Sequence, residues 1–284
     1  MSAFNVAVIG GGNIGASLAY DCALRDCRVT IVEKDAEACA QSRERVAGIA
    51  AHGRLFSPLA RHSTPAQVLE NIRWTDEIEA VSACDLVVEN IPEDLQLKEP
   101  LYRRLGEVLH PDAVLAANTS CIPITHLGGC SGRPEQVIGV HFMNPVYMKD
   151  TVEVIVGLRT SEQTRTRCLE HLALLGKQAV VVNDGPGFVS NRVSHLFMNE
   201  AAFTVHDGVA DPAEVDTIFK QCFGHRMGPL ETADLIGIDT VVNSLDVLYA
   251  MFQDSKYRVC PLMRRMAEAG FHGRKSGKGF YTYA

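Results

Sequence analysis

Several features that mark particular classes of protein are absent from this sequence of 284 residues. No apolar run approaches the roughly 20 residues that a membrane-spanning helix needs. The first residues, MSAFNVAVIGGG, lack the basic stretch that opens a signal peptide. We find no internal repeat and no low-complexity segment. These absences favour a soluble globular protein with no membrane partner, and we expect it in the cytoplasm.

Long basic runs and paired cysteines are also absent. The formal net charge is −7 at pH 7, so neither nucleic acid nor an anionic membrane surface is an expected partner. The nine cysteines are odd in number and form no C-x-x-C pair. This favours buried reduced thiols over a disulfide framework or a zinc site, and we therefore expect no bound metal.

A glycine-rich turn stands near the start of the chain. The strand-like run FNVAVI leads into Gly10, Gly12 and Gly15, and the residues that follow have helical composition. In a G-x-G-x-x-G turn between a strand and a helix, the first glycine makes the tight turn, the second lets backbone approach a pyrophosphate, and the third allows close packing. The helix N-terminus then offers N–H groups and a positive dipole end to the phosphates. The pattern predicts a dinucleotide-binding domain.

A second strand-like run, RVTIV, ends on Glu33. A carboxylate at this distance from the glycines accepts both ribose hydroxyls of an adenosine and repels a 2′-phosphate, which favours NAD over NADP. The adjacent Lys34 could weaken that discrimination. The alternative is that Glu33 is an ordinary exposed acid at a strand end.

The stretch from Val137 to Ile155 carries a histidine and a carboxylate. A short apolar run delivers His141 to the end of one predicted strand, a loop with a proline follows, and a second β-branched run carries Glu153. Two strands and a turn fit into the twelve residues between them, so the two side chains can lie side by side. Such a pair suits general-base catalysis. The alternative is a loop histidine satisfied by backbone and a solvated strand position.

Further predicted elements complete an α/β pattern. We expect strands at 84–89, 113–117 and 178–182, helices at 95–109 and 161–175, and a helical, irregular region from 35 to about 74. Ser120 closes an N-T-S turn at a strand's carboxyl end, where open α/β sheets bind ligands, although N-T-S is also an ordinary turn. The irregular region carries Arg43, Arg45, Arg54, Arg61, His62 and Arg73, which either meet substrate phosphates or form a solvated face.

The composition changes near Pro186. From Phe188 onward the β-type runs disappear and long helical patterns take over. Asp211, Pro212 and Glu214 have the spacing of a helix start. We therefore predict a Rossmann-type, mostly parallel α/β domain over 1–186, followed by an all-helical domain over 187–284 that binds substrate and forms a dimer.

Eight motifs together resemble the 3-hydroxyacyl-CoA dehydrogenase family in order and spacing. They are VIGGGNIG, VVENIPED with Lys98, NTS, HFMNP, TVEVI, GPGFVSNR, GPLETADLIGID and GRKSGKGFYTY, and they cover essentially the whole chain. The resemblance implies an NAD-dependent oxidoreductase in which His141 is the general base and Glu153 orients and stabilises its imidazole. Ser120 and Asn191 match positions that hydrogen-bond the substrate oxygen or thioester carbonyl, with the substrate between the domains.

The remaining site residues follow from the same resemblance. Cofactor contacts are expected from Gly10, Gly12, Asn13, Ile14, Gly15, Glu33, Glu93, Lys98, Asn118 and Ser120. Substrate contacts are expected from Ser120, Asn144, Asn191 and Arg54, the last in a segment that carries lysines near the CoA phosphates in many relatives. Arginine can also hold phosphate.

The loop NPVYMKDTVEV departs from the family pattern, since many members have a second proline where this chain has Tyr147. Three functions therefore stay open. The first is oxidation of a short L-3-hydroxyacyl-CoA such as 3-hydroxybutyryl-CoA. The second is the same chemistry on an acyl carrier protein, for example on a glyceryl group in polyketide extender-unit synthesis. The third is a non-catalytic, crystallin-like protein. The apolar helices after Pro186 also predict a homodimer.

Overall fold

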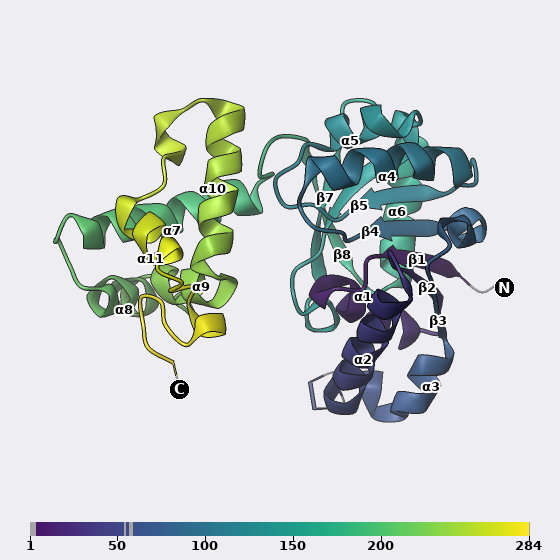
Figure 1. Cartoon of the computed structure of the whole chain (residues 1–284), viewed down its shortest axis with the longest axis horizontal. Helices are drawn as coiled ribbons and strands as arrows, with labels where there is room; N and C mark the ends of the chain where they lie inside the picture. Colours follow the sequence, from purple (N-terminus) through teal and green to yellow (C-terminus); the bar gives the residue numbers. More distant parts are fainter. Residues whose placement is uncertain (1–3, 54, 57–58, 284) are drawn as a thin grey trace. The chain divides into compact units, whose positions relative to one another are not determined.

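The computed structural model describes residues 4–53, 55–56 and 59–283. The chain divides into two compact units, Met1–Gly185 and Pro186–Ala284. The first unit is an α/β domain and the second is helical (Figure 1).

The first unit is built on one eight-stranded sheet with the strand order β3-β2-β1-β4-β5-β6-β7-β8. Every neighbouring pair runs parallel except β6 and β7, which run antiparallel. The strands are β1 (Asn5–Ile9), β2 (Arg28–Val32), β3 (Ile72–Thr75), β4 (Leu86–Glu89), β5 (Val114–Ala117), β6 (Val137–His141), β7 (Thr151–Val156) and β8 (Gln178–Asn183). The expected mostly parallel sheet is confirmed.

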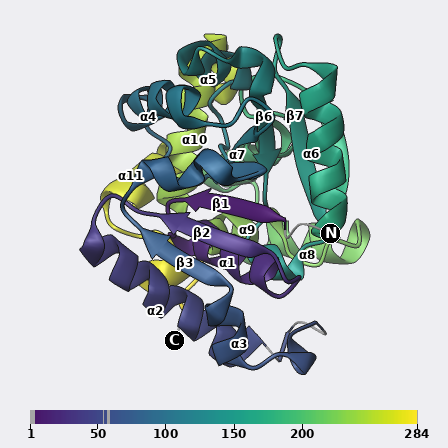
Figure 2. The ribbon, with the colours of Figure 1, turned by 90° about the vertical axis from the view of Figure 1, so that its right-hand side faces the viewer.

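Helices cover both faces of this sheet (Figure 2). They are α1 (Asn13–Ala23), α2 (Ala36–Gly53), α3 (Pro65–Glu70), α4 (Leu95–Val108), α5 (Ile124–Ser131) and α6 (Glu162–Leu174), with short 3₁₀ turns that include η4 (Val146–Met148). Apolar side chains of α1, α2 and α6 share one core with alternate residues of the central strands, such as Val6 and Val8. On the other face, Ile124 of α5 lies against Gly139 of β6. Because both faces are buried, the central strands are continuously apolar rather than alternating.

One strand was not expected. β3, with the sequence IRWT, lies in the region that we predicted to be helical and irregular. It is an edge strand of four residues that pairs only with β2, and only Ile72 in it is buried. A run this short, with one buried residue, gives no readable period in the sequence.

The second unit contains α7 (Ser190–His206), α8 (Pro212–Cys222), α9 (Pro229–Ile236), α10 (Ile238–Phe252) and α11 (Pro261–Glu268). These helices share a core that includes Met198, Leu230, Val241 and Met263. The predicted helix start at Asp211 is confirmed, because a capping box joins it to Glu214.

Two buried aspartates hold the C-terminal tail against these helices. Asp234 accepts hydrogen bonds from Phe280 N at 3.0 Å, Tyr281 N at 3.0 Å and the Tyr283 hydroxyl at 2.9 Å. Asp216 accepts from the Tyr281 hydroxyl at 2.7 Å. The basic, aromatic tail is therefore ordered through charge-assisted hydrogen bonds.

Among the described residues, no single helix has both the length and the apolar character to cross a membrane. The sharply bent pair α9 and α10 passes that test only when the two helices are taken together.

Candidate active site

The glycine turn after β1 has the geometry of a dinucleotide cradle. Gly10 has a φ of +88° and its N–H donates to the Val32 carbonyl over 2.9 Å. A Cβ on Gly15 would lie 1.9 Å from the Gly10 oxygen, so only glycine fits there. Gly12 precedes α1 with no side-chain cap, and a Cβ on it would meet nothing within 4 Å. The helix N-terminus is therefore open to a pyrophosphate, and the residues present fit NAD.

Glu33 lies against this turn. Its carboxylate accepts a hydrogen bond from Gly11 N at 2.6 Å, and Arg45 donates to the Gly11 carbonyl over 3.4 Å. The acid that follows β2 is thus fixed beside the glycines, close to the place where an adenosine ribose is held in such folds.

His141 and Glu153 are direct partners across the antiparallel pair β6 and β7. The His141 Nδ1 to Glu153 Oε2 distance is 3.2 Å, and the two residues are only 6% and 8% exposed. A carboxylate can only accept, so Nδ1 carries the proton of the neutral ring and Nε2 keeps its lone pair. Nε2 lies 3.3 Å from the Ser120 hydroxyl. The predicted pairing of the two side chains is confirmed. His141 ends a strand and is not a loop histidine, and Glu153 is buried and not solvated.

The loop that carries Ser120 is held by Glu93. This carboxylate accepts from the Thr119 hydroxyl at 2.6 Å, from Ser120 N at 3.0 Å and from Cys121 N at 2.8 Å. Three donors on one carboxylate fix the backbone that presents the Ser120 hydroxyl. The structure therefore shows that Glu93 supports the loop that carries Ser120, and its predicted contact with the cofactor stays a prediction.

Lys98 is fully buried. Its Nζ lies 2.7 Å from both Glu89 oxygens and 3.7 Å from Glu93 Oε2. Tyr102 also donates to Glu89 over 3.2 Å, and burial raises the pKa of its phenol well above the ordinary value. Because a buried ammonium needs paired charge, Lys98 acts here as the counter-charge of the buried Glu89, with Glu93 as a more distant second partner. Its predicted contact with the cofactor stays a prediction.

Asn118 links the ends of two strands. Its Oδ1 accepts from Phe142 N at 3.0 Å, and its Nδ2 donates to Asn90 over 2.6 Å. The residue after His141 is thereby tied to the end of β5. This bond helps to orient the imidazole of His141. The predicted contact of Asn118 with the cofactor stays a prediction.

The backbone of the loop between His141 and Glu153 is held by hydrogen bonds to residues that we did not predict. Lys177 donates to the carbonyls of Val146 and Lys149 over 2.7 and 2.8 Å, and its Nζ lies 2.6 Å from Asp21 of α1. Ser17 Oγ accepts from Val146 N at 2.8 Å. Burial raises the pKa of Asp21, and the Lys177 ammonium opposes that shift. A lone acid inside the buried stretch of α1 was the available sequence signal.

A pocket of about 430 Å³ lies between the start of α1, where cofactor contacts are predicted, and the loop after His141, where a substrate contact is predicted. It is lined by Asn13, Ala16, Ser17, Arg45, Gly48, Ile49, His52, Asn144, Pro145 and Tyr147. The structure therefore brings Asn13, a predicted cofactor contact, together with Asn144, a predicted substrate contact. Tyr147 is half-buried and packs edge-on against Tyr20 with ring centroids 5.3 Å apart.

The basic residues of the region predicted to be irregular, Arg43 to Arg73, have different surroundings. Arg45 lines the pocket, whereas the Arg43 guanidinium lies 4.6 Å above the Trp74 ring. Arg54 and the side chain of His62 lie outside the described residues. The predicted contact of Arg54 with a substrate phosphate therefore stays a prediction.

Asn191 belongs to the second unit. It lies in the first turn of α7, where its carbonyl accepts from His195 Nδ1 at 2.9 Å. Its predicted contact with the substrate stays a prediction.

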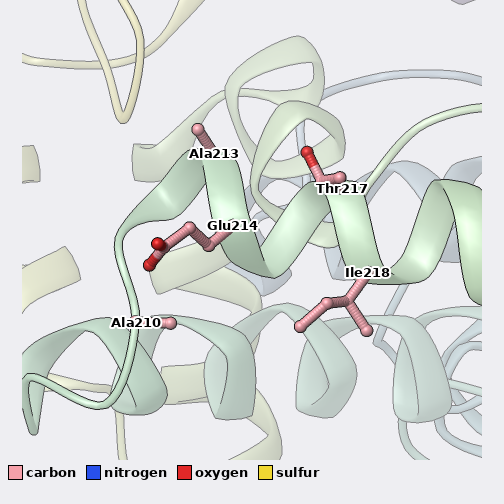
Figure 3. Close-up of a pocket in the computed structure, with 5 residues that line it drawn as sticks. All are labelled: Ala210, Ala213, Glu214, Thr217 and Ile218. Carbon is pink, nitrogen blue, oxygen red and sulfur yellow. The ribbon is translucent and has the colours of Figure 1, made fainter.

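A second pocket, of about 470 Å³, lies at the turn before α8 and along its first turns (Figure 3). It is lined by Ala210, Ala213, Glu214, Thr217 and Ile218. Of these five, Glu214 alone is ionisable, and its carboxylate already accepts from Asp211 N at 2.9 Å. The pocket therefore holds no catalytic set of groups.

The features of the first unit converge on one edge of its sheet. β1, β5 and β6 run parallel, so the glycine turn, Ser120 and His141 all follow carboxyl ends of strands. Open α/β sheets bind ligands at this edge. A dinucleotide cradle beside a buried carboxylate–histidine pair defines a dehydrogenase that takes a proton and a hydride from an alcohol.

Comparison with known proteins agrees with that class. The sequence matches the 3-hydroxyacyl-CoA dehydrogenase NAD binding domain over residues 5–185 and the C-terminal domain of the same family over 187–283. It is 43% identical over 278 residues to a probable 3-hydroxybutyryl-CoA dehydrogenase from Deinococcus radiodurans, covering 97% of this chain and 99% of that protein.

Solved structures match over the full length of both chains. FadB2 from M. tuberculosis has a TM-score of 0.94 at 34% identity and covers 100% of each chain. The (S)-3-hydroxybutyryl-CoA dehydrogenase PaaH1 from Ralstonia eutropha has a TM-score of 0.91 at 35% identity, again over 100% of each chain. The chain belongs to the 3-hydroxyacyl-CoA dehydrogenase family. It is an NAD-dependent dehydrogenase, and the predicted fold class, cofactor and family are confirmed.

Proposed function

We propose that the protein interconverts a short L-3-hydroxyacyl-CoA and its 3-oxoacyl-CoA, with 3-hydroxybutyryl-CoA and acetoacetyl-CoA as the preferred pair. The observation that carries this proposal is the hydrogen-bonded series Ser120, His141 and Glu153, at the sheet edge that follows the glycine turn. The names of the relatives from Deinococcus radiodurans and Ralstonia eutropha support the acyl group.

In the oxidising direction, His141 Nε2 accepts the proton of the substrate hydroxyl. When bound, NAD would supply the acceptor for the hydride that leaves the carbon bearing this hydroxyl. Glu153 holds the Nδ1–H and stabilises the imidazolium that forms, in a site where low solvent exposure strengthens the charge interaction. The Ser120 hydroxyl, released from Nε2, donates to the substrate oxygen. In the reverse direction His141 returns the proton to the forming alkoxide.

The other site residues have proposed roles in holding the two ligands. Glu33 selects NAD over NADP through the adenosine ribose. Asn144 lines the pocket beside Asn13 and contacts the acyl thioester, and Asn191 and Arg54 complete the substrate contacts. Arg45 lines the same pocket, and a cationic group there suits a phosphorylated carrier.

We also propose a cytoplasmic homodimer that forms through the helical unit. This unit exposes large apolar side chains at Val209, Ile218, Phe223 and Leu235, which are between 49% and 74% exposed. Exposed apolar surface on this scale is typical of interaction sites. Sedimentation at micromolar concentration should give twice the chain mass of 31.0 kDa. A monomer would contradict this proposal.

Substrate class is tested by following NADH absorbance with acetoacetyl-CoA, and then with the acetoacetyl group on an acyl carrier protein. We expect rapid oxidation of NADH with the CoA ester and slow oxidation with the carrier-bound group. The exposed, polar Lys149 and Asp150 beside the site favour the carrier protein as the second candidate. Activity with the carrier-bound group alone would replace the first candidate by the second, and activity with neither would contradict both.

A further inference from the structure

A cluster of three metal-ligating side chains lies outside the active site, where α4 and α5 meet. The helices touch closely, since a Cβ on Gly106 of α4 would lie 1.7 Å from the Ser131 oxygen of α5. Both views of the first unit show the two helices side by side (Figures 1 and 2). Glu99 projects from α4, and His126 and Cys130 project from α5 one helical turn apart. In the part of the chain that the structure describes, these three are the one group of three or more histidine, cysteine or acidic side chains whose ligand atoms lie close enough to share a metal ion.

The distances in the cluster are close to those that a bound zinc ion imposes. His126 Nε2 lies 3.0 Å from Glu99 Oε1 and 3.9 Å from Cys130 Sγ, and all three atoms lie within 4.8 Å of one another. Zinc bonds of about 2.0 Å to nitrogen or oxygen and about 2.3 Å to sulfur, at tetrahedral angles, require about 3.3 Å between His126 Nε2 and Glu99 Oε1 and about 3.5 Å between His126 Nε2 and Cys130 Sγ. Both pairs that include His126 are therefore within about 0.4 Å of the required distances, and rotation of the Glu99 and Cys130 side chains has to close the third pair from within 4.8 Å.

We propose that Glu99, His126 and Cys130 bind a divalent zinc ion. An imidazole, a thiol and a carboxylate form a donor set that suits zinc better than magnesium or calcium, which prefer oxygen alone. Three protein ligands leave the fourth position to water, so the ion is exchangeable. The sequence predicted no metal because it has no C-x-x-C pair. This site would not show such a motif, because the fold brings Glu99 to His126 and Cys130 from a distant part of the sequence.

Neighbouring groups set the strength of this site. Burial raises the pKa of the Cys130 thiol, so the ion displaces a proton when it binds. The Arg103 guanidinium lies 3.2 Å from Glu99 Oε2. It leaves Glu99 Oε1 for the ion, but its positive charge repels a cation. The affinity is therefore lower than that of a closed structural site, and removal of Arg103 should increase it.

The test uses the full-length protein without a histidine tag, reduced with a phosphine that does not hold metal. Zinc affinity is measured by competition with a chelating dye, and cobalt serves as a spectroscopic probe because a thiolate ligand gives it a charge-transfer band. Loss of an outer partner of a metal site costs roughly 10–100-fold in affinity, so loss of a ligand in Cys130→Ser or His126→Gln should cost at least about tenfold. Cys130→Ser should also lose the band, and Arg103→Gln should bind zinc more tightly.

The matched control is Cys222→Ser, which removes an exposed thiol on the other unit. It should keep both the band and the zinc affinity of the parent protein. An unchanged band in Cys130→Ser, loss of the band in Cys222→Ser, or no zinc bound at micromolar concentration would each overturn the proposal. Circular dichroism of every variant separates loss of a ligand from loss of the fold. None of these readouts depends on the dehydrogenase activity.

Discussion

Replacement of Glu153 by glutamine tests the role proposed for His141 as general base. The carboxylate lies 3.2 Å from His141 Nδ1, and both side chains are almost fully buried. A hydrogen bond to a charged group contributes about 1.5–3 kcal/mol, which corresponds to a loss of about 10- to 150-fold in turnover when the charge is removed. If the amide turns its NH₂ group toward Nδ1, the ring takes the wrong tautomer and the loss reaches about 10⁴-fold, as in a Ser–His–Asp triad.

The assay is steady-state reduction of acetoacetyl-CoA, with NADH binding measured separately by fluorescence. We expect kcat to decrease by about 10- to 150-fold, or by up to about 10⁴-fold if the ring takes the wrong tautomer. The Kd for NADH should stay near the parent value, because the glycine turn is unchanged. The same change at Glu162, which is exposed and pairs with Arg165, is the matched control and should leave both quantities unaltered. Equal turnover in the parent protein and Glu153→Gln would refute the argument and leave Glu153 a structural residue.

Three further changes test other parts of the account. Lys177→Met removes the nearer of the two cations beside the buried Asp21, while Arg25 stays 3.6 Å away, so the free energy of unfolding in urea should fall by about 3 kcal/mol, the low end of the cost of breaking a buried pair. Tyr281→Phe removes the hydroxyl that donates to Asp216 over 2.7 Å, and should cost about 1.5–3 kcal/mol in the same measurement. Glu33→Ser removes the carboxylate at the glycine turn, so NADH binding should weaken and the preference over NADPH should narrow.

The two changes that test stability have matched controls. Lys149→Met alters an exposed lysine of the same loop, and Tyr249→Phe alters a tyrosine that is 44% exposed; both should shift the free energy of unfolding by less than about 0.5 kcal/mol. Equal losses in a test variant and its control would contradict the role given to burial. An unchanged ratio of NADH to NADPH affinity in Glu33→Ser would remove that residue from cofactor selection.

The parts of the site that were predictable are those with a local pattern. Gly10 and Gly15 follow a strand and precede a helix, so turn chemistry alone identifies them. The pairing of His141 with Glu153 follows from two strands and a turn of fixed length, because side chains opposite each other in an antiparallel pair are neighbours. These features need only a few residues of sequence context.

The unpredicted parts depend on contacts between distant segments. The bond from Val146 N to Ser17 joins residues 129 positions apart. Lys177, which directly precedes β8 beside β7, donates to the same loop from 31 positions away. No periodicity in the sequence reports such contacts. The partner of Lys98 was likewise not predictable, because the sequence gives no sign that its ammonium is buried beside Glu89, nine residues earlier in the chain.

The central claim is that His141 is the general base of a 3-hydroxyacyl-CoA dehydrogenase. Its most direct test is the turnover of His141→Ala with acetoacetyl-CoA and NADH, compared with His110→Ala at an exposed position of the same unit. General-base catalysis contributes about 10²–10⁴-fold, so His141→Ala should lose activity by at least that factor while it binds NADH normally. Turnover near that of the parent protein in His141→Ala would contradict the claim.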